Sequence, residues 1–364
     1  MKRNRLVHIA GFVFVALTLV ALSLTACTQP APAPTPTPTP APTPAAEQDV
    51  FKWKWQTTMP AGSINFEEQK ASTDDLREMS NGRIDLTIYP GGALVGYADM
   101  LEALSAGTFE VAWNFPTFYT GVDPAFAALS NHYGLLETPD HVIAWADYLG
   151  GNEIAAELYA QYNVQYISTQ ICTPEPIQST VPLYHPEDFK GIKIRTSAGY
   201  TQDLFEKLGA APLQLSGGEI YTALDTGVID ATEFLGVKSN WDMGFHEVAK
   251  YILYPSFHSP TALADMGVNM DSWNKLPDDL KAIFRGFALD AERKYYYSSV
   301  AYDHKALNDM VEYGSEWIKW SEEDMAKVRA MALEVTMDWK TKSPMADKII
   351  TSKIDAAKIL GMMD

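Results

Sequence analysis

The chain has 364 residues, 47% hydrophobic and 20% charged, which excludes a wholly disordered chain and favours two domains. Its 28 Lys+Arg against 46 Asp+Glu give a formal charge of −18, so nucleic acid and anionic membrane are unfavourable partners. With Cys27 and Cys172 as its two cysteines, the chain has neither a disulfide framework nor a zinc or iron–sulfur cluster built on cysteine.

The N-terminus has the layout of a secretory signal peptide. Basic residues within the first five positions precede an apolar run over 9–26. Leu24-Thr25-Ala26-Cys27 resembles the bacterial lipobox, whose cysteine is lipidated and becomes the mature N-terminus. We therefore predict a signal peptide over 1–26 and a lipid on Cys27. The alternative is an uncleaved anchor, because the apolar run approaches the length of a membrane span. Both place the remaining chain outside the inner membrane.

Residues 30–44 have proline at every second position. This pattern forbids helix and central strand and favours extended polyproline II. We predict that residues 27–49 are a stiff tether between the lipid and a globular part, suited to a protein held near a membrane partner. The alternative is a spacer without a partner.

The next segment alternates strands and helices. Apolar alternation, helical periodicity and the helix stop at Asn81-Gly82 locate the elements. The predicted order is strand 51–55, helix 63–80, strand 83–89, helix 97–106 and strand 109–115. This βαβαβ order is typical of an open, mostly parallel sheet.

A second βαβαβ unit follows later in the chain. Its predicted elements are strand 192–195, helix 199–208, strand 211–215, helix 217–226 and strand 228–234. Two such α/β lobes leave a cleft between them, and ligands bind at the carboxyl ends of the strands. Long helices are predicted at the C-terminal end, over 277–314, 321–340 and 344–361. The first of them is longer than a typical globular helix, so we expect it either to bend or to brace both lobes.

Local signatures of catalysis are missing from the sequence. It contains no G-x-S-x-G, H-E-x-x-H, G-x-x-x-x-G-K-[ST] or G-x-G-x-x-G motif. The histidines show no closely spaced ligand pair, and Cys172 is interpreted as a buried structural thiol. These absences make an enzyme less expected, but they do not disprove one, because many active sites have no local signature.

Three strand ends offer side chains that could hold a ligand. Arg195 ends the strand before a loop and helix, and a guanidinium matches a carboxylate with two parallel hydrogen bonds. Gln170 ends the apolar strand 164–170, and Glu233 lies near the end of 228–234. Their oxygens are of the kind that Na⁺ or Ca²⁺ prefers. For each residue, an ordinary surface role is the alternative.

Several segments together resemble the solute receptors of TRAP transporters. The matching segments, in chain order, are Tyr89-Pro90-Gly91-Gly92-Ala93-Leu94, Asp188-Phe189-Lys190-Gly191-Ile192-Lys193-Ile194-Arg195, Glu219-Ile220-Tyr221-Thr222-Ala223-Leu224, Val228-Ile229-Asp230-Ala231 and Leu276-Pro277-Asp278-Asp279-Leu280. Each motif is weak alone, but their order and spacing agree over about residues 51–350.

The resemblance implies an α/β, two-lobed periplasmic-binding-protein fold whose long C-terminal helices brace both lobes. We expect lobe I over 50–177 and 262–302, and lobe II over 178–261 and 303–364. Such a receptor is not an enzyme and needs no organic cofactor. It closes on an organic acid outside the cytoplasm and delivers it to a membrane permease driven by a cation gradient. A homodimer is left open.

The resemblance also assigns residues to the site. Arg195 matches the arginine that binds the ligand carboxylate, and the branch that binds 2-oxoacids and hydroxyacids can include a metal ion. Gln170 and Glu233 match its metal ligands, and Phe234 matches a position that offers its backbone carbonyl. Further ligand contacts are predicted at Asn114 and Phe257. His258 follows Phe257 where that branch often has an acid.

We therefore expect a lipid-anchored receptor for a small 2-oxo or 2-hydroxy monocarboxylate, with Na⁺ or Ca²⁺ at the ligand site. One alternative is a receptor for a larger or aromatic acid, which would use Trp113, Phe115, Tyr119, Phe234 and Trp241. Packing in the core is the ordinary role of such side chains. A second alternative is an extracellular hydrolase, which would need an acid, base or nucleophile set that the sequence does not reveal.

Overall fold

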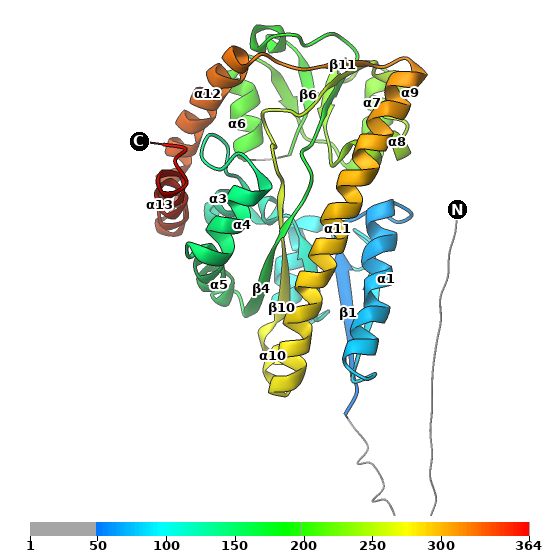
Figure 1. Cartoon of the computed structure of the whole chain (residues 1–364), viewed down its shortest axis with the longest axis vertical. Helices are drawn as coiled ribbons and strands as arrows, with labels where there is room; N and C mark the ends of the chain where they lie inside the picture. Colours follow the sequence, from blue (N-terminus) through cyan, green and yellow to red (C-terminus); the bar gives the residue numbers. More distant parts are fainter. Residues whose placement is uncertain (1–48, 198, 364) are drawn as a thin grey trace, which may run out of the picture. The chain divides into compact units, whose positions relative to one another are not determined.

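The computed structural model describes residues 49–197 and 199–363, and these residues form two β-sheets surrounded by helices (Figure 1). The predicted signal peptide, Cys27 and the proline tract lie outside the described residues. Within the described part of the chain, no helix combines the length and apolar character needed to cross a membrane.

The first sheet is built around the predicted N-terminal βαβαβ unit. Its strands, in spatial order, are β2 (Ile84–Tyr89), β1 (Phe51–Thr57), β3 (Val111–Asn114), β10 (Leu263–Asn269) and β4 (Val164–Ile171). β1 pairs in parallel with β2 and β3, as predicted. The alternation along β1 buries Trp53 and Trp55 and leaves Lys52 and Lys54 exposed. β10 is buried over its whole length because it lies between β3 and β4.

Helices cover this sheet and complete the first lobe. They are α1 (Ile64–Met79), the short η1 (Tyr97–Asp99), α2 (Met100–Ser105), η2 (Pro116–Tyr119), α3 (Pro124–Ser130), α4 (Pro139–Tyr148), α5 (Gly151–Ala160) and α10 (Met270–Lys275). The Ser63 side chain caps α1 by accepting from the Phe66 amide. α1 and α2 confirm the predicted helices.

The second sheet contains the second predicted unit and defines the second lobe. Its strands, in spatial order, are β11 (Glu316–Ile318), β9 (Tyr251–Leu253), β5 (Ile177–Ser179), β8 (Ala231–Glu233), β6 (Lys193–Arg195) and β7 (Ala211–Leu213). Its short helices are η3 (Pro186–Phe189), α6 (Tyr200–Lys207), η4 (Gly217–Glu219), α7 (Ile220–Asp225), α8 (Val237–Asp242) and α9 (Phe245–Val248). β6 pairs in parallel with β7 and β8, as predicted.

Both sheets are mixed, which differs from the mostly parallel sheet that we predicted. β10 runs antiparallel to β3 and β4, and β5 runs antiparallel to β8 and β9. These strands adjoin the extended connections between the sheets, residues 172–176 after β4 and 254–262 before β10. The reversal therefore arises where the chain passes from one lobe to the other.

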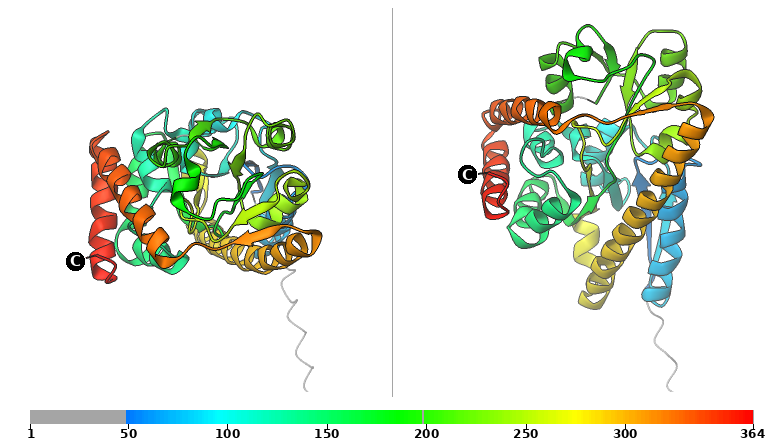
Figure 2. Two further views of the ribbon diagram at one scale, coloured as in Figure 1. Left: turned by 90° about the horizontal axis from the view of Figure 1, so that it is seen from above. Right: turned by 45° about the horizontal axis from the view of Figure 1, so that its top comes forward.

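The long C-terminal helices contact both lobes (Figure 1, Figure 2). α11 (Asp278–Tyr313) packs against α1 and β4 of the first lobe and against α8 of the second. α12 (Glu322–Lys340) packs against α6 and α3. The prediction that these helices brace both lobes is therefore confirmed.

The last helix, α13 (Pro344–Ile359), packs against α3, α4 and α5 of the first lobe. The buried ammonium of Lys353 donates to the carbonyls of Ala128, Leu129 and Asn131 at 2.7–2.9 Å, near the end of α3. This packing differs from the expected place of residues 303–364 in lobe II. The lobe boundaries themselves stay a prediction.

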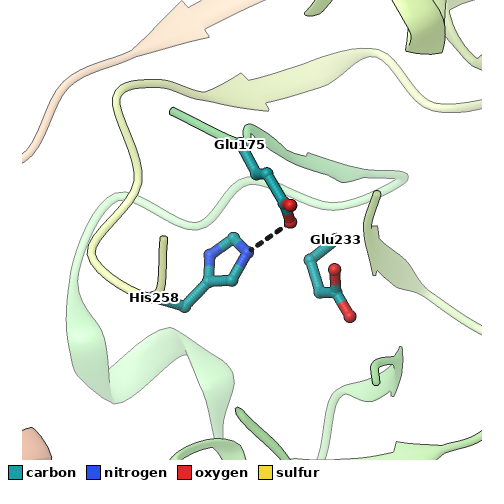
Figure 3. Close-up of side chains that lie close together, drawn as sticks. All are labelled: Glu175, Glu233 and His258. Atoms are coloured by element: carbon teal, nitrogen blue, oxygen red, sulfur yellow. Dashed lines mark ion pairs between the residues drawn. The ribbon is translucent and has the colours of Figure 1, made fainter. Parts of the chain in front are cut away.

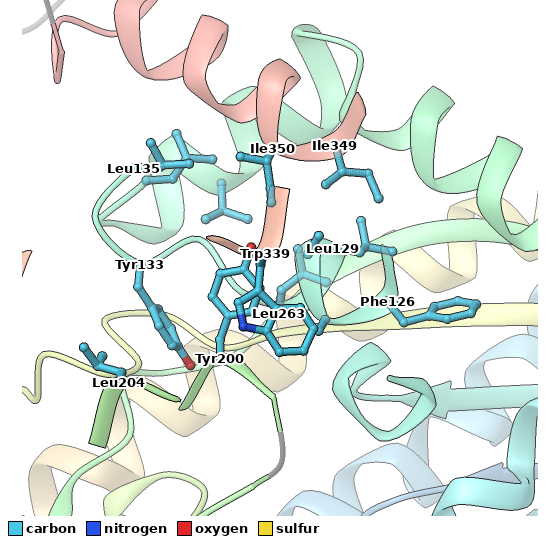
Figure 4. Close-up of a cluster of buried hydrophobic side chains, with 14 of the residues drawn as sticks. Phe126, Leu129, Tyr133, Leu135, Tyr200, Leu204, Leu263, Trp339, Ile349 and Ile350 are labelled. Atoms are coloured by element: carbon cyan, nitrogen blue, oxygen red, sulfur yellow. The ribbon is translucent and has the colours of Figure 1, made fainter. Parts of the chain in front are cut away.

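One buried hydrophobic cluster joins the two lobes beside α12 (Figure 4). It brings Phe126 and Leu129 of the first lobe together with Tyr200 and Leu204 of the second, and α12 contributes Trp339. The rings of Tyr200 and Trp339 lie 4.8 Å apart, centroid to centroid. The two sheets are thereby held around a cleft whose chemistry is set by the loops that face it.

Candidate functional site

A cavity of about 80 Å³ lies between the two lobes. Its lining comes from the segments that follow β3, α3, β6 and β8 and from both connections between the sheets, which matches the rule that ligands bind at the carboxyl ends of strands. The lining residues are Phe115, Thr117, Phe118, Ser130, Asn131, Tyr133, Glu175, Arg195, Ser197, Thr201, Glu233, Phe234, Leu235, His258, Ser259, Thr261, Ala262 and Leu263.

Arg195 is held rigidly at the end of β6. Its Nη1 donates to the Glu233 carbonyl at 2.7 Å and to Glu233 Oε1 at 3.2 Å, and its Nε donates to the Leu215 carbonyl at 3.2 Å. Phe234 packs against the guanidinium, with its ring centroid 5.2 Å from Cζ. Nη2 has no acceptor among the residues that the structure describes. Arg195 is only 8% exposed and lines the cavity, so a buried cation faces the cavity.

Two carboxylates and an imidazole lie beside this arginine (Figure 3). Glu175, Glu233 and His258 each offer a ligand atom, and these atoms lie within 4.8 Å of one another. The Ser197 amide donates to Glu233 Oε1 at 2.5 Å. His258 Nδ1 is hydrogen-bonded to Ser256 Oγ at 2.5 Å, while its buried Nε2 lies 3.5 Å from Glu175 Oε2 and forms no hydrogen bond with the described residues.

Burial dominates the ionisation of this cluster. It raises the pKa of Glu233 to about 7, although Arg195 opposes the shift; nearby Glu175 raises it further. Burial also raises the pKa of Glu175. It lowers the pKa of His258 to about 4, so this imidazole is neutral at pH 7. Two adjacent carboxyl groups therefore share one guanidinium as their compensating charge.

This donor set fits a hard cation. Carboxylate oxygens are preferred ligands of Na⁺ and Ca²⁺. Glu175 supplies one carboxylate from the connection between β4 and β5, and Glu233 supplies the other from the end of β8. The neutral imidazole of His258 is a weaker ligand for such ions than a carboxylate. Its Nε2, which has no hydrogen-bond partner among the described residues, could still contact a polar atom of a ligand. The cluster differs from the predicted metal set, which had Gln170 in place of Glu175.

The structure brings together Arg195, Glu233 and Phe234, but it places the other predicted residues elsewhere. Gln170 donates to Ser168 Oγ and to the Ala288 carbonyl of α11, so it packs between β4 and α11. Asn114 is fully buried in the first sheet, and its side chain donates to the Phe115 carbonyl. Phe257 stacks on Trp320 at 4.8 Å between ring centroids, away from the cavity lining.

Asn114 and Phe257 each lie one residue away from a lining residue. Their neighbours Phe115 and His258 line the cavity, since successive side chains of extended chain point in opposite directions. Gln170 is not among the lining residues for another reason. The chain continues beyond β4 for several residues before it reaches the cavity, where it presents Glu175.

Residues that sequence reasoning missed complete the cavity wall. Its polar lining residues include Ser130, Asn131, Thr201, Ser259 and Thr261, and Phe118 and Leu235 add apolar lining. Tyr133 Oη of the first lobe lies 3.2 Å from Thr201 Oγ1 of the second, within hydrogen-bond distance. None of these residues stands in a sequence motif, so no local signal could have found them.

Of the aromatic residues named for a receptor of a larger or aromatic acid, some line the cavity and the others pack elsewhere. Phe115 and Phe234 line the cavity. Trp113 and Tyr119 are buried in the core of the first lobe, and Trp241 stacks on His246 at 3.9 Å between ring centroids. The cavity itself is far smaller than the ~300–1,000 Å³ typical of sites for drug-sized ligands.

Comparison with known proteins identifies the family. The model of the family "Bacterial extracellular solute-binding protein, family 7" matches residues 56–342. A monocarboxylate 2-oxoacid-binding periplasmic protein of Nostoc sp. (strain PCC 7120) is 29% identical over 289 residues, which are 77% of this chain and 76% of that protein.

Solved structures agree with this match. A TRAP periplasmic solute-binding protein from Rhodobacter sphaeroides, in an apo open structure, is 31% identical with a TM-score of 0.71 and covers 86% of this chain and 99% of its own. Another from Colwellia psychrerythraea, with bound calcium and pyruvate, has the same fold at 24% identity and a TM-score of 0.77, over 86% of this chain and 96% of its own.

These matches confirm the predicted two-lobed fold, and they confirm a receptor rather than an enzyme, since the family consists of solute-binding proteins. The chain belongs to the bacterial extracellular solute-binding proteins of family 7 and is an extracytoplasmic solute receptor of the TRAP type.

Proposed function

We propose that this receptor captures a small 2-oxo or 2-hydroxy monocarboxylate between its lobes and delivers it to a TRAP-type membrane permease. The observation that carries the proposal is Arg195, a buried guanidinium that lines a cavity of about 80 Å³. Arg195 would pair with the ligand carboxylate. The 2-oxoacid-binding relative from Nostoc sp. supports this ligand class.

A hard cation, Na⁺ or Ca²⁺, would be held by the carboxylates of Glu175 and Glu233, with His258 beside it. When bound, such an ion supplies positive charge and coordinates oxygen atoms. The charges of the surrounding residues explain why a cation would be needed. Burial raises the pKa of Glu233 to about 7 and also raises that of Glu175. Ionisation of both carboxyl groups beside the single charge of Arg195 would leave an excess negative charge that opposes an anionic ligand, and a bound cation would offset it. The calcium and pyruvate bound to the Colwellia protein support this part of the proposal.

The small cavity favours this ligand over a larger or aromatic acid. Phe115, Phe118 and Phe234 are among its lining residues, and they would contact a methyl or short alkyl group. The hydroxyl groups of the lining residues Ser130 and Thr201 suit a keto or hydroxyl oxygen.

Calorimetric titration with pyruvate, lactate and phenylpyruvate tests the proposal, each in buffer with Ca²⁺, with Na⁺ and with neither ion. We expect pyruvate or lactate to bind more tightly than phenylpyruvate, and more tightly with a cation than without. Mass spectrometry of acid released from the purified, denatured protein identifies the natural ligand. Preference for phenylpyruvate, or release of a large aromatic acid, would contradict the proposed ligand class.

We further propose that Cys27 carries a lipid that holds the receptor on the periplasmic side or outer face of the cell membrane, with residues 27–49 as a tether. The lipobox-like Leu24-Thr25-Ala26-Cys27 motivates this proposal. Labelled fatty acid should enter the wild-type chain and not Cys27→Ala; equal labelling of both would contradict it. A homodimer stays a prediction.

A further inference from the structure

A buried polar network lies behind the ligand cavity, on the side of α11. Ser299 and Asp303 are four residues apart on α11 and therefore share one face of this helix. Asp303 Oδ2 accepts from Thr173 Oγ1 at 2.5 Å, and Asp303 Oδ1 accepts from the Lys238 amide at 2.7 Å. Asp303 is 2% exposed, so this carboxylate is fully committed to organising the chain around it.

The two donors to Asp303 belong to the segments that carry the acidic residues of the site. Thr173 lies two residues before Glu175 in the first connection between the sheets. Lys238 follows the turn that begins at Glu233, at the end of β8. Asp303 therefore fixes both acidic segments at once, although it does not line the ligand cavity itself.

The turn after Glu233 leaves little freedom. Leu235 has a φ of +38°, which is unusual for a residue with a side chain. A Cβ on Gly236 would lie 2.7 Å from Asp303 Oδ2 and 2.9 Å from Thr173 Oγ1. The turn is thus packed directly on the network, and a displacement of one displaces the other.

A hydrogen bond between the lobes lies beside this network, where Asn65 contacts the neighbouring residues Ser239 of α8 and Ser299 of α11. Ser239 Oγ of α8, in the second lobe, donates to Asn65 Oδ1 of α1, in the first lobe, at 3.1 Å. Asn65 Nδ2 donates in turn to Ser299 Oγ of α11 at 3.3 Å. All three side chains are buried. Figure 1 shows α1 and α8 on the same side of the molecule as α11.

This interlobe hydrogen bond lies close to the ligand site without being part of it. Asn65, Ser239, Ser299 and Asp303 line a second cavity of about 10 Å³. That cavity shares Phe115, Glu175 and Leu235 with the ligand cavity. The interlobe hydrogen bond and the acidic residues of the site are therefore connected through one layer of side chains.

We propose that the Asn65–Ser239 hydrogen bond is a latch that holds the lobes closed, and that Asp303 is a positioning residue that couples this latch to Glu175 and Glu233. Separation of α1 from α8 breaks the bond and exposes or orphans its polar atoms, so the bond favours the closed arrangement. The apparent affinity for a ligand scales with the fraction of the protein in its binding-competent form. The choice of pyruvate as the test ligand rests on the proposed function, whereas the latch itself does not depend on which ligand binds.

Ser239→Ala and Asn65→Leu remove the latch from opposite sides. In the ligand-free full chain, we expect both variants to exchange amide hydrogen faster than wild type in segments 115–118 and 195–197, which contribute lining residues from the two lobes. Pyruvate affinity in the presence of Ca²⁺ should fall by roughly fivefold, the effect of one buried hydrogen bond. Ser72→Ala is the control, because the buried Ser72 hydroxyl donates to the Gln69 carbonyl within α1.

Unchanged exchange in both variants, or pyruvate affinity within twofold of wild type, would overturn the latch. A wild type that binds no pyruvate would instead count against the proposed function, and the exchange measurement would still decide the latch. Asp303→Asn distinguishes positioning from simple stabilisation: it should weaken the Ca²⁺ dependence of pyruvate binding, whereas Ser239→Ala should leave that dependence in place. Equal Ca²⁺ dependence in Asp303→Asn and wild type would overturn the positioning role.

Discussion

Replacement of Arg195 by alanine is expected to weaken pyruvate binding by at least roughly 30-fold. Truncation of one partner of a buried, hydrogen-bonded charge pair typically costs ~2–5 kcal/mol, and each ~1.4 kcal/mol is a factor of ten. The substitution also removes the compensating charge beside Glu175 and Glu233, so the remaining cluster repels a carboxylate. Calorimetric titration in the presence of Ca²⁺ measures the loss.

Two further variants separate charge from geometry. Arg195→Lys keeps the positive charge but loses the planar set of donors that reaches Glu233 and Leu215, so its affinity should also be clearly impaired. Arg293→Ala is the matched control, because this α11 arginine lies over the Tyr297 ring and away from the cavity lining. Pyruvate affinity within about threefold of wild type for Arg195→Ala would show that the carboxylate is held elsewhere.

The repeated βαβαβ units could be predicted because their signals are local. Alternation in β1 and helix stops such as Asn81-Gly82 depend on neighbouring residues alone. β10 gave no such signal. Its side chains are buried on both faces, so its sequence does not alternate between apolar and polar residues, and its partners β3 and β4 come from distant parts of the chain.

Some residues of the candidate site could likewise be predicted from the sequence, and others could not. Arg195 and Glu233 could be predicted because each lies at the end of a strand in a βαβ unit, where ligands bind. Glu175 and His258 could not, since they lie in extended connections that are interrupted by prolines and have no periodicity. Which side chain of such a connection faces the cavity depends on how the two lobes meet, and this is a property of tertiary packing.

The second large expected effect concerns Glu233, one of the two carboxylates of the cluster. Glu233→Ala is expected to weaken pyruvate binding in Ca²⁺ buffer by about 10- to 100-fold, in line with the ~1.5–3 kcal/mol of a hydrogen bond or contact to a charged group. It should also remove most of the difference between buffers with and without Ca²⁺ or Na⁺. The reason is that Glu233 supplies one of the two carboxylates of the cluster, and Glu175 alone is a poor site for a hard cation.

Loss of the Glu233 carboxylate also has an effect that strengthens the binding of an anion. Without its carboxylate, residue 233 still offers a backbone carbonyl to Arg195, but the guanidinium loses its ionic partner and becomes a stronger attractor for an anion. Glu233→Ala could therefore retain affinity in cation-free buffer while it loses the response to Ca²⁺, so the response is the decisive quantity. Glu206→Ala, which removes an exposed carboxylate of α6 in the same lobe, is the control. Equal pyruvate affinity of the wild type in Ca²⁺ buffer and in chelated, sodium-free buffer would contradict the cation while leaving the role of Arg195 intact, because the arginine binds the carboxylate without it.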